Sequence, residues 1–230
     1  MSNLKNLTPN SKWRGKTVVF CLPGNNYSGD FLVNFSHLMM WCYNNGIQPY
    51  ISQDYSSMVN YARCRVLGAN VFKGKNQKPF GGEIEYDYMM WIDSDIFFNV
   101  QSFIDLLEMD VDVASGWYAQ PNGKIPIIRK SRDEDFLING SYEYIPMQEL
   151  QAMDKPFEVD VIGFGWVLIK KGVFESIPYP WFAPKYFELD GGIADVHSED
   201  SSCCLDIQNA GYKIIVNPKI RVGHEKRITI

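Results

Sequence analysis

The sequence predicts an α/β fold with a mostly parallel central sheet, and three observations lead to this class. Apolar runs rich in β-formers alternate with stretches of helical spacing through the N-terminal half. Gly, Pro and Asn residues punctuate the boundaries between these stretches. The 230 residues are 46% hydrophobic, which is enough for a sizeable core. Such alternation implies right-handed crossovers between parallel strands, so a ligand is expected beyond their carboxyl ends.

The N-terminal half carries the alternation. Residues 16–22 (KTVVFCL) predict a first strand that ends in a loop at Pro23 and Gly24, where the backbone can approach a ligand closely. The next stretch, 28–45, has apolar residues at helical spacing and stops at an Asn-Gly pair. The remaining elements predicted here are a strand at 47–52, a helix at about 56–71, a strand at 86–92, a helix at about 101–108 and a strand at 112–118.

The C-terminal half is less regular. Residues 157–169 (FEVDVIGFGWVLI) predict strands that are broken by Gly163 and Gly165. The other elements predicted are a helix at 199–210 and a strand at 213–217. Residues 125–130 (IPIIRK) receive no assignment, and the mixed, acidic stretch 131–155 predicts a mobile loop.

Composition narrows the class of protein. The chain has 22 lysines and arginines against 27 aspartates and glutamates, without a basic stripe, so we expect no nucleic-acid partner. No apolar run approaches the roughly 18 residues of a membrane span, and the polar N-terminus lacks the apolar core of a secretion signal. Five cysteines without a CxxC pair favour neither a disulfide framework nor a zinc knuckle. We expect a cytoplasmic protein and assign no role to Cys203 and Cys204.

Two acidic residues, Asp93 and Asp95, directly follow an apolar strand in YDYMMWIDSDIFFN. Ionised carboxylates next to apolar side chains are costly unless a counter-charge is present, and residues 80–122 contain no Lys, Arg or His. Protonation, a distant arginine or a bound cation could relieve the pair, and a divalent cation is the most economical of these. Oxygen ligands suit Mg²⁺ or Mn²⁺. A solvated turn is the alternative.

These residues carry a family resemblance. The segment MMWIDSDIFF resembles the Asp-x-Asp motif of metal-dependent glycosyltransferases of the GT-A fold. Three further segments resemble that family in the same order: SMVNYARCRVLGANVF, VIGFGWVLIKKGVFE and SEDSSCCLDIQNAGYKIIVNPKIRVGH. The resemblance spans about residues 16–224 and is to compact domains of family-two relatives and of large algal viruses. It implies one domain, 1–230, with a Rossmann-like nucleotide-sugar half at about 16–118 fused to an acceptor-binding and catalytic half at about 119–230.

The resemblance also implies a metal site and a nucleotide site. The metal-site residues are Asp93, Asp95 and His224, where Asp95 and His224 hold the ion and Asp93 contacts the ribose or a metal-bound water. A ligand set that mixes nitrogen and oxygen favours Mn²⁺ over Mg²⁺. We expect a UDP-sugar donor in preference to a GDP-sugar. The implied nucleotide-binding residues are Pro23, Gly24, Arg63, Asp93 and Ser94.

A second acidic pair, Glu199 and Asp200, follows the helix N-cap Ser198. The helix macrodipole favours ionised carboxylates in the first turn, so we expect Asp200 to stay deprotonated, which suits a general base. Acids in a first turn also stabilise a helix without any other role. The resemblance implies that Asp200 takes the proton of the acceptor hydroxyl while Glu199 orients a substrate or loop. His197 is a spare candidate for metal or acceptor contact.

The reaction that the resemblance implies is the transfer of a sugar from a nucleoside-diphosphate sugar to a hydroxyl of a glycan or glycoprotein, preferably with inversion. Two alternatives stay open. One is nucleotidyl transfer to sugar phosphates, although CLPGNNYSGD lacks the cation of a phosphate loop. The other is a non-catalytic carbohydrate-binding domain. Trp181 is predicted to be exposed, as part of an acceptor platform. If the protein is viral, the host cytoplasm is its expected location, and its oligomeric state is not predicted.

Overall fold

The structure is a computed structural model that describes residues 11–226. The predicted absence of a secretion signal depends on residues 1–10, which lie outside the described residues. No helix of the described chain has the length and apolar character needed to cross a bilayer.

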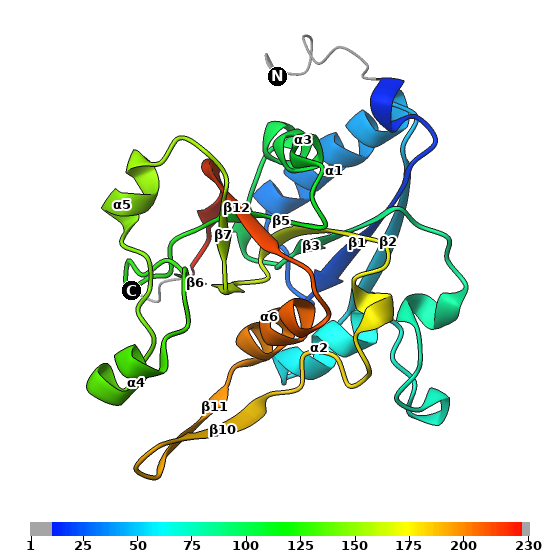
Figure 1. Cartoon of the computed structure of the whole chain (residues 1–230). Helices are drawn as coiled ribbons and strands as arrows, with labels where there is room; N and C mark the ends of the chain where they lie inside the picture. The colour runs from blue at the N-terminus through cyan, green and yellow to red at the C-terminus, as the bar shows by residue number, and fades with distance from the viewer. Residues whose placement is uncertain (1–10, 227–230) are drawn as a thin grey trace.

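A seven-stranded sheet forms the centre of the molecule (Figure 1), in the order β2-β1-β3-β9-β5-β12-β7. Its strands are β1 (Thr17–Pro23), β2 (Gln48–Asp54), β3 (Tyr88–Ile92), β5 (Val113–Trp117), β7 (Phe157–Val159), β9 (Trp166–Lys170) and β12 (Ile214–Arg221). Five of the seven strands run in one direction, because only β9 and β7 are antiparallel to their neighbours. The predicted α/β class with a mostly parallel sheet is therefore confirmed.

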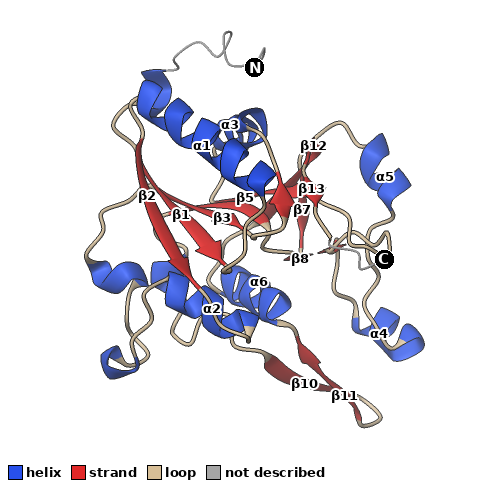
Figure 2. Ribbon diagram, turned by 180° about the vertical axis from the view of Figure 1, so that it is seen from behind, coloured by secondary structure: helices blue, strands red, loops and turns tan. Residues whose placement is uncertain are grey.

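Helices cover both faces of this sheet, as Figure 2 shows. Helices α1 (Gly29–Asn44) and α3 (Val100–Met109) lie on one face, and α2 (Val59–Val66) and α6 (Glu199–Asn209) lie on the other. The alternation of side chains along β1 explains the two layers. Val18, Phe20 and Leu22 pack into the core under α1 and α3, while Val19 and Cys21 pack into the core under α2 and α6. A sheet buried on both faces needs the near-continuous apolar strands that the sequence has.

The remaining elements of the described chain are short helices, strand pairs and turns. They are α4 (Asp133–Asn139), α5 (Met147–Ala152), the pairs β4 (Ile96–Phe97) with β13 (Gly223–His224), β6 (Ile127–Ile128) with β8 (Val161–Ile162) and β10 (Lys185–Leu189) with β11 (Ile193–His197), and 3₁₀ turns at Ser11–Trp13, Val71–Lys73, Pro79–Gly82 and Phe174–Ser176. The β10–β11 hairpin projects from the body of the molecule (Figure 1).

The structure corrects three expectations about these elements. Residues 131–155, which were expected to form a mobile loop, contain α4 and α5. The β10–β11 hairpin was not predicted, although Gly191 and Gly192 at its turn have positive φ values, 83° and 77°. Trp181 was expected to be exposed, but it is 1% exposed, and its indole N–H donates to the carbonyl of Ile177.

Candidate active site

The loop after β1 and the turn after β3 lie side by side, because β1 and β3 are neighbouring parallel strands with Cys21 opposite Trp91. Gly24 (φ 145°) packs so closely against Ser94 that a Cβ at Gly24 would lie 2.8 Å from both the Cβ and the Oγ of Ser94. A glycine is therefore needed where these two segments meet. Two of the predicted nucleotide-binding residues are brought together at the carboxyl ends of the strands, where the sequence places the ligand.

The counter-charge of Asp93 is an arginine from a distant part of the chain. Arg63, on α2, donates from Nη1 to Asp93 Oδ1 (3.0 Å) and from Nη2 to Asp93 Oδ2 (3.3 Å), which is a bidentate pair. The Arg63 side chain is only 2% exposed. The sequence predicts that Arg63 contacts the nucleotide, but in this structure its guanidinium is enclosed by protein. Its visible role is to neutralise the first carboxylate of the Asp-x-Asp turn.

Arg63 also reaches the second acidic pair. Its Nη2 lies 3.3 Å from Asp200 Oδ1, and its Nε lies 4.0 Å from Glu199 Oε1. The rings of Trp91, Phe164 and Phe182 surround the guanidinium, with their centroids 5.6–5.8 Å from its central carbon. One buried cation thus joins three carboxylates from the turn after β3 and the N-terminus of α6, and the cluster keeps a formal charge of −2 when all three are ionised.

This surplus of negative charge changes the ionisation of Asp200. Burial, together with the charges of Glu199 and Asp93, raises the pKa of Asp200 above its ordinary value, and this outweighs the opposing effect of Arg63. The helix macrodipole, which favours the ionised form, contributes less here than the cost of an excess buried charge. The Phe164 N–H donates to Asp200 Oδ2 (3.1 Å) and orients the carboxyl group.

Asp95 has different partners from Asp93. The short β4–β13 ladder places His224 opposite Ile96, and the Glu225 N–H donates to the Asp95 carbonyl (2.7 Å). His224 Nε2 then lies 3.1 Å from Asp95 Oδ2. Burial alone would raise the pKa of Asp95, but hydrogen bonds and charges from His224 and Lys226 lower it to about 2. Two of the three predicted metal ligands therefore meet across 129 residues of chain.

The orientation of the His224 ring is suited to a metal ion. Its Nδ1 lies 3.1 Å from the carbonyl oxygen of Ala119, which can only accept a hydrogen bond, so Nδ1 carries a proton. Nε2 then faces an ionised carboxylate oxygen of Asp95. Two acceptors at this separation need a proton or a cation between them. A metal-binding histidine commonly has its second ring nitrogen held by a backbone carbonyl in this way.

Asp93 does not join this pair, because both of its oxygens bond to Arg63. Among residues 11–226, no group of three or more His, Cys, Asp and Glu side chains is arranged to hold a metal ion. The residues present thus fit a cation that takes Asp95 and His224 from the protein and its other ligands from a diphosphate, which is common for Mg²⁺.

A cleft of about 610 Å³ opens beside Asp95. The residues that line it are Asn26, Ser28, Asp30, Ser94, Asp95, Glu225 and Lys226. Lys226 is not among the predicted site residues, and its Nζ lies 2.5 Å from Asp95 Oδ2. No pattern in the sequence marks it, since it comes after the last segment that resembles the family. The volume of this cleft is within the range of small-ligand sites.

His197, the spare candidate, does not lie beside Asp95 and His224 in the contacts of the described chain. Its ring stacks on Phe187 (4.3 Å between centroids) and lies parallel to Tyr142 (6.1 Å), on the β10–β11 hairpin. With Asp160 and Ser201 it lines a separate pocket of about 310 Å³. Contact with an acceptor therefore stays a prediction for His197. All five cysteines are buried and free.

A scan against protein-family models finds no match, and no curated protein matches the chain. Solved structures with a similar fold include A197 from STIV (TM-score 0.48, 16% identity, covering 94% of this chain and 96% of that one). Another is GalNAc-T7 with UDP, GalNAc and Mn²⁺ (TM-score 0.48, 10% identity, covering 93% and 43%). A third is mannosyl-3-phosphoglycerate synthase from Rubrobacter xylanophilus (TM-score 0.43, 14% identity, covering 93% and 68%). In this chain the central sheet is mostly parallel and is built from both halves of the sequence.

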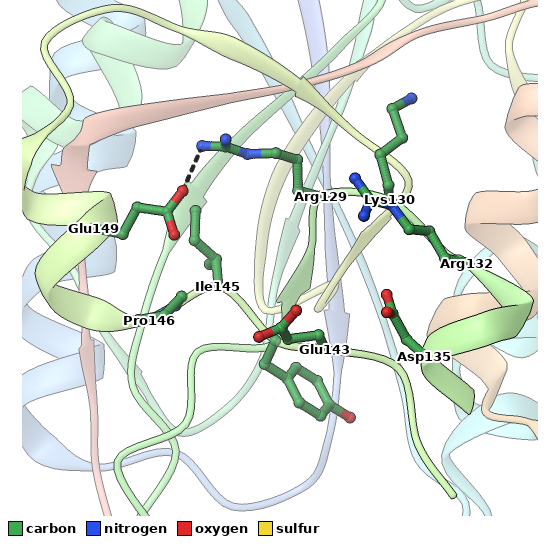
Figure 3. A pocket seen from close by; sticks show the side chains of 9 residues that line it. Arg129, Lys130, Arg132, Asp135, Glu143, Ile145, Pro146 and Glu149 are labelled. Atoms are coloured by element: carbon green, nitrogen blue, oxygen red, sulfur yellow. Dashed lines mark ion pairs between the residues drawn. The ribbon is translucent and has the colours of Figure 1, made fainter. Parts of the chain in front are cut away.

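A different pocket, of about 180 Å³, lies between α4 and α5 (Figure 3). Two of its three cationic residues, Arg129 and Lys130, come from the stretch 125–130 that received no assignment, and the third, Arg132, comes from the predicted loop 131–155. Arg129 pairs with Glu149 (2.9 Å), as the dashed line in Figure 3 shows, and Lys130 pairs with Asp160 (3.2 Å). Acidic side chains match the cations in number, so the pocket does not have the surplus positive charge that binds an anion.

Proposed function

We propose that this chain is a metal-dependent glycosyltransferase that moves a sugar from a nucleoside diphosphate to an acceptor hydroxyl. The observation that carries the proposal is the meeting of Asp95 Oδ2 and His224 Nε2, 3.1 Å apart, where Asp95 lines an acidic cleft. The position supports a phosphorylated donor, because the cleft lies beyond the carboxyl ends of parallel strands. The resemblance in the sequence agrees with this assignment.

The charges in the cleft support a requirement for a metal ion. Of the side chains that line it, Asp30, Asp95 and Glu225 are acidic and Lys226 alone is basic. A diphosphate that enters would meet a net negative wall, so additional positive charge has to come with it. Asp95 and His224 would hold a Mn²⁺ or Mg²⁺ ion, which supplies stabilisation of the negative charge that develops on the leaving diphosphate.

The second acidic pair supports the acceptor side of the proposal. We assign Asp200 as the base that takes the proton from the acceptor hydroxyl, with Glu199 beside it. A raised pKa makes a carboxylate a stronger base, which is better matched to removing a hydroxyl proton near neutral pH. In this structure Asp200 Oδ1 is closed to solvent and lies 3.3 Å from Arg63 Nη2. The acceptor would therefore approach the exposed part of the Asp200 side chain, which is 21% of its surface. One base on one face favours inversion.

The donor site would use the close contact of Gly24 with Ser94 as its floor. Asp93 is held in place by Arg63, so its free lone pairs can accept from the ribose hydroxyls without movement of the turn. In this assignment Arg63 is a positioning residue for the Asp-x-Asp turn. We expect UDP-sugars to bind in preference to GDP-sugars.

The proposal is tested by donor binding and donor turnover in parallel. Thermal unfolding of the full chain is followed with UDP, GDP and dTDP, each with and without Mn²⁺, because a ligand of the folded state raises its apparent stability. We expect a metal-dependent shift, greatest with UDP, and metal-dependent hydrolysis of the matching nucleotide sugar. Metal-independent binding of sugars with no nucleotide response would overturn the proposal in favour of a carbohydrate-binding domain.

A further inference from the structure

Lys226 occupies the place beside Asp95 where a cation is expected. The Glu225 N–H holds the C-terminal segment to the Asp95 carbonyl, and Lys226 Nζ then lies 2.5 Å from Asp95 Oδ2. His224 Nε2 meets the same oxygen at 3.1 Å. Both side chains of the ion pair are partly solvated, with Lys226 42% and Asp95 39% exposed, so the ammonium can leave without opening the core.

The position of Lys226 conflicts with metal binding through Asp95. A divalent cation held by Asp95 Oδ2 and His224 Nε2 would lie close to the Lys226 ammonium, and like charges at such separations repel strongly. The ion therefore has to displace Lys226 from this oxygen. Metal binding to the free protein then carries the cost of breaking an ion pair and of leaving the ammonium without a partner.

A diphosphate would remove that cost. Lys226 is the single basic side chain among the described residues that line the cleft, and the other charged ones are Asp30, Asp95 and Glu225. An ammonium released from Asp95 stays in the same cleft, where it can donate to phosphate oxygens as a point charge. The diphosphate needs a positive partner and the displaced Lys226 needs a negative one, so binding of the diphosphate satisfies both.

We propose that Lys226 is a transferable counter-ion: it neutralises Asp95 in the free protein and passes to the diphosphate when the metal ion takes Asp95. This rests on the proposed function and adds a mode of regulation to the same site. The consequence is a positive coupling between metal and nucleotide. Bound metal releases Lys226 for the diphosphate, and bound diphosphate holds Lys226 away from Asp95, so each ligand raises the affinity for the other. The free protein then holds little metal in the absence of donor.

The test measures Mn²⁺ affinity in the full chain with and without saturating UDP, by titration calorimetry and by the electron paramagnetic resonance of free Mn²⁺. In Lys226→Met the competing ammonium is absent, so we expect Mn²⁺ to bind the free protein about 5- to 50-fold more tightly than in the wild type. The enhancement of Mn²⁺ affinity by UDP should fall by a similar factor. Lys226→Arg keeps the charge and should keep the coupling.

A matched control is Lys213→Met, which removes a lysine whose partner is Glu158 (2.8 Å), outside the cleft. It should leave Mn²⁺ affinity and its coupling to UDP unchanged. If wild-type protein binds no Mn²⁺ with UDP, the proposed function fails. If the wild type binds both ligands but Lys226→Met changes neither the Mn²⁺ affinity nor the coupling by more than twofold, the proposed function survives and the role of Lys226 is overturned.

Discussion

Replacement of Arg63 by methionine tests whether one guanidinium holds the acidic cluster together. The variant keeps an apolar side chain among the aromatic rings but leaves three carboxylates without their shared cation. At an effective dielectric constant of about 20, each contact at 3–4 Å is worth about 4–6 kcal/mol. Desolvation of the guanidinium offsets much of this sum, so removal of the partner should cost about 3–5 kcal/mol. For a chain of this size, that lowers the melting temperature by about 6–20 °C.

The assay is equilibrium unfolding in urea at two pH values. Without Arg63, the clustered carboxylates lose the cation that favours their ionised form, and the raised pKa of Asp200 rises further, so the folded state takes up protons more readily. Stability of the variant therefore falls as the pH rises, and its deficit relative to the wild type should be larger at pH 8 than at pH 5. Arg63→Lys keeps a charge without the planar fork and should show an intermediate loss.

Arg65→Met is the matched control from the same helix, because Arg65 is 58% exposed and pairs with Asp54 at 3.7 Å. Such a surface pair contributes under about 1 kcal/mol. If Arg63→Met loses no more than this control, and the loss is the same at both pH values, then Arg63 is not the counter-charge of the cluster.

Three further outcomes are expected. Asp95→Ala should abolish Mn²⁺-dependent UDP binding while it lowers stability by under about 1 kcal/mol, since its ion pair is 39–42% exposed, and retained binding in calorimetry would exclude the metal site. The rate of donor turnover should fall as the pH drops through the raised pKa of Asp200, above the ordinary aspartate value of about 3.9, and a flat pH–rate profile would exclude Asp200 as base. Gly24→Ala should cost about 1–3 kcal/mol in urea unfolding and weaken UDP binding, because its Cβ would lie 2.8 Å from Ser94, whereas Gly29→Ala, with nothing within 4 Å, should do neither.

The sequence predicted those elements whose signals are local. The β-rich run before Pro23 and the helical spacing that follows Ser28 are both properties of neighbouring residues, and the structure has β1 and α1 there. Residues 131–155 lack such a signal, and in the β10–β11 hairpin the local signal is confined to the glycines of its turn. Their order comes from contacts between distant segments, such as Phe136 with Phe187 at 5.1 Å between ring centroids.

The candidate site shows the same division. The sequence shows that no cation lies near Asp93 and Asp95 along the chain, and it leaves a distant arginine open as their counter-charge. Which counter-charge applies depends on how α2 packs against β1 and β2, which brings Arg63 to Asp93, and no local pattern in the sequence reports this packing. The two acids have different partners in the structure: Asp93 contacts Arg63, and Asp95 contacts His224 and Lys226.

The antiparallel strand β9 lies in the middle of the sheet, where Leu168 pairs with Met90 of β3 on one side and with Ala114 of β5 on the other. During synthesis on a ribosome, β3 and β5 emerge about seventy and about fifty residues, respectively, before the strand that joins them. Until then, amide and carbonyl groups that end up deepest in the finished molecule are open to pairing with another nascent chain. Productive maturation of this protein should therefore benefit from a holding chaperone, and fragments that stop short of Trp166 should aggregate.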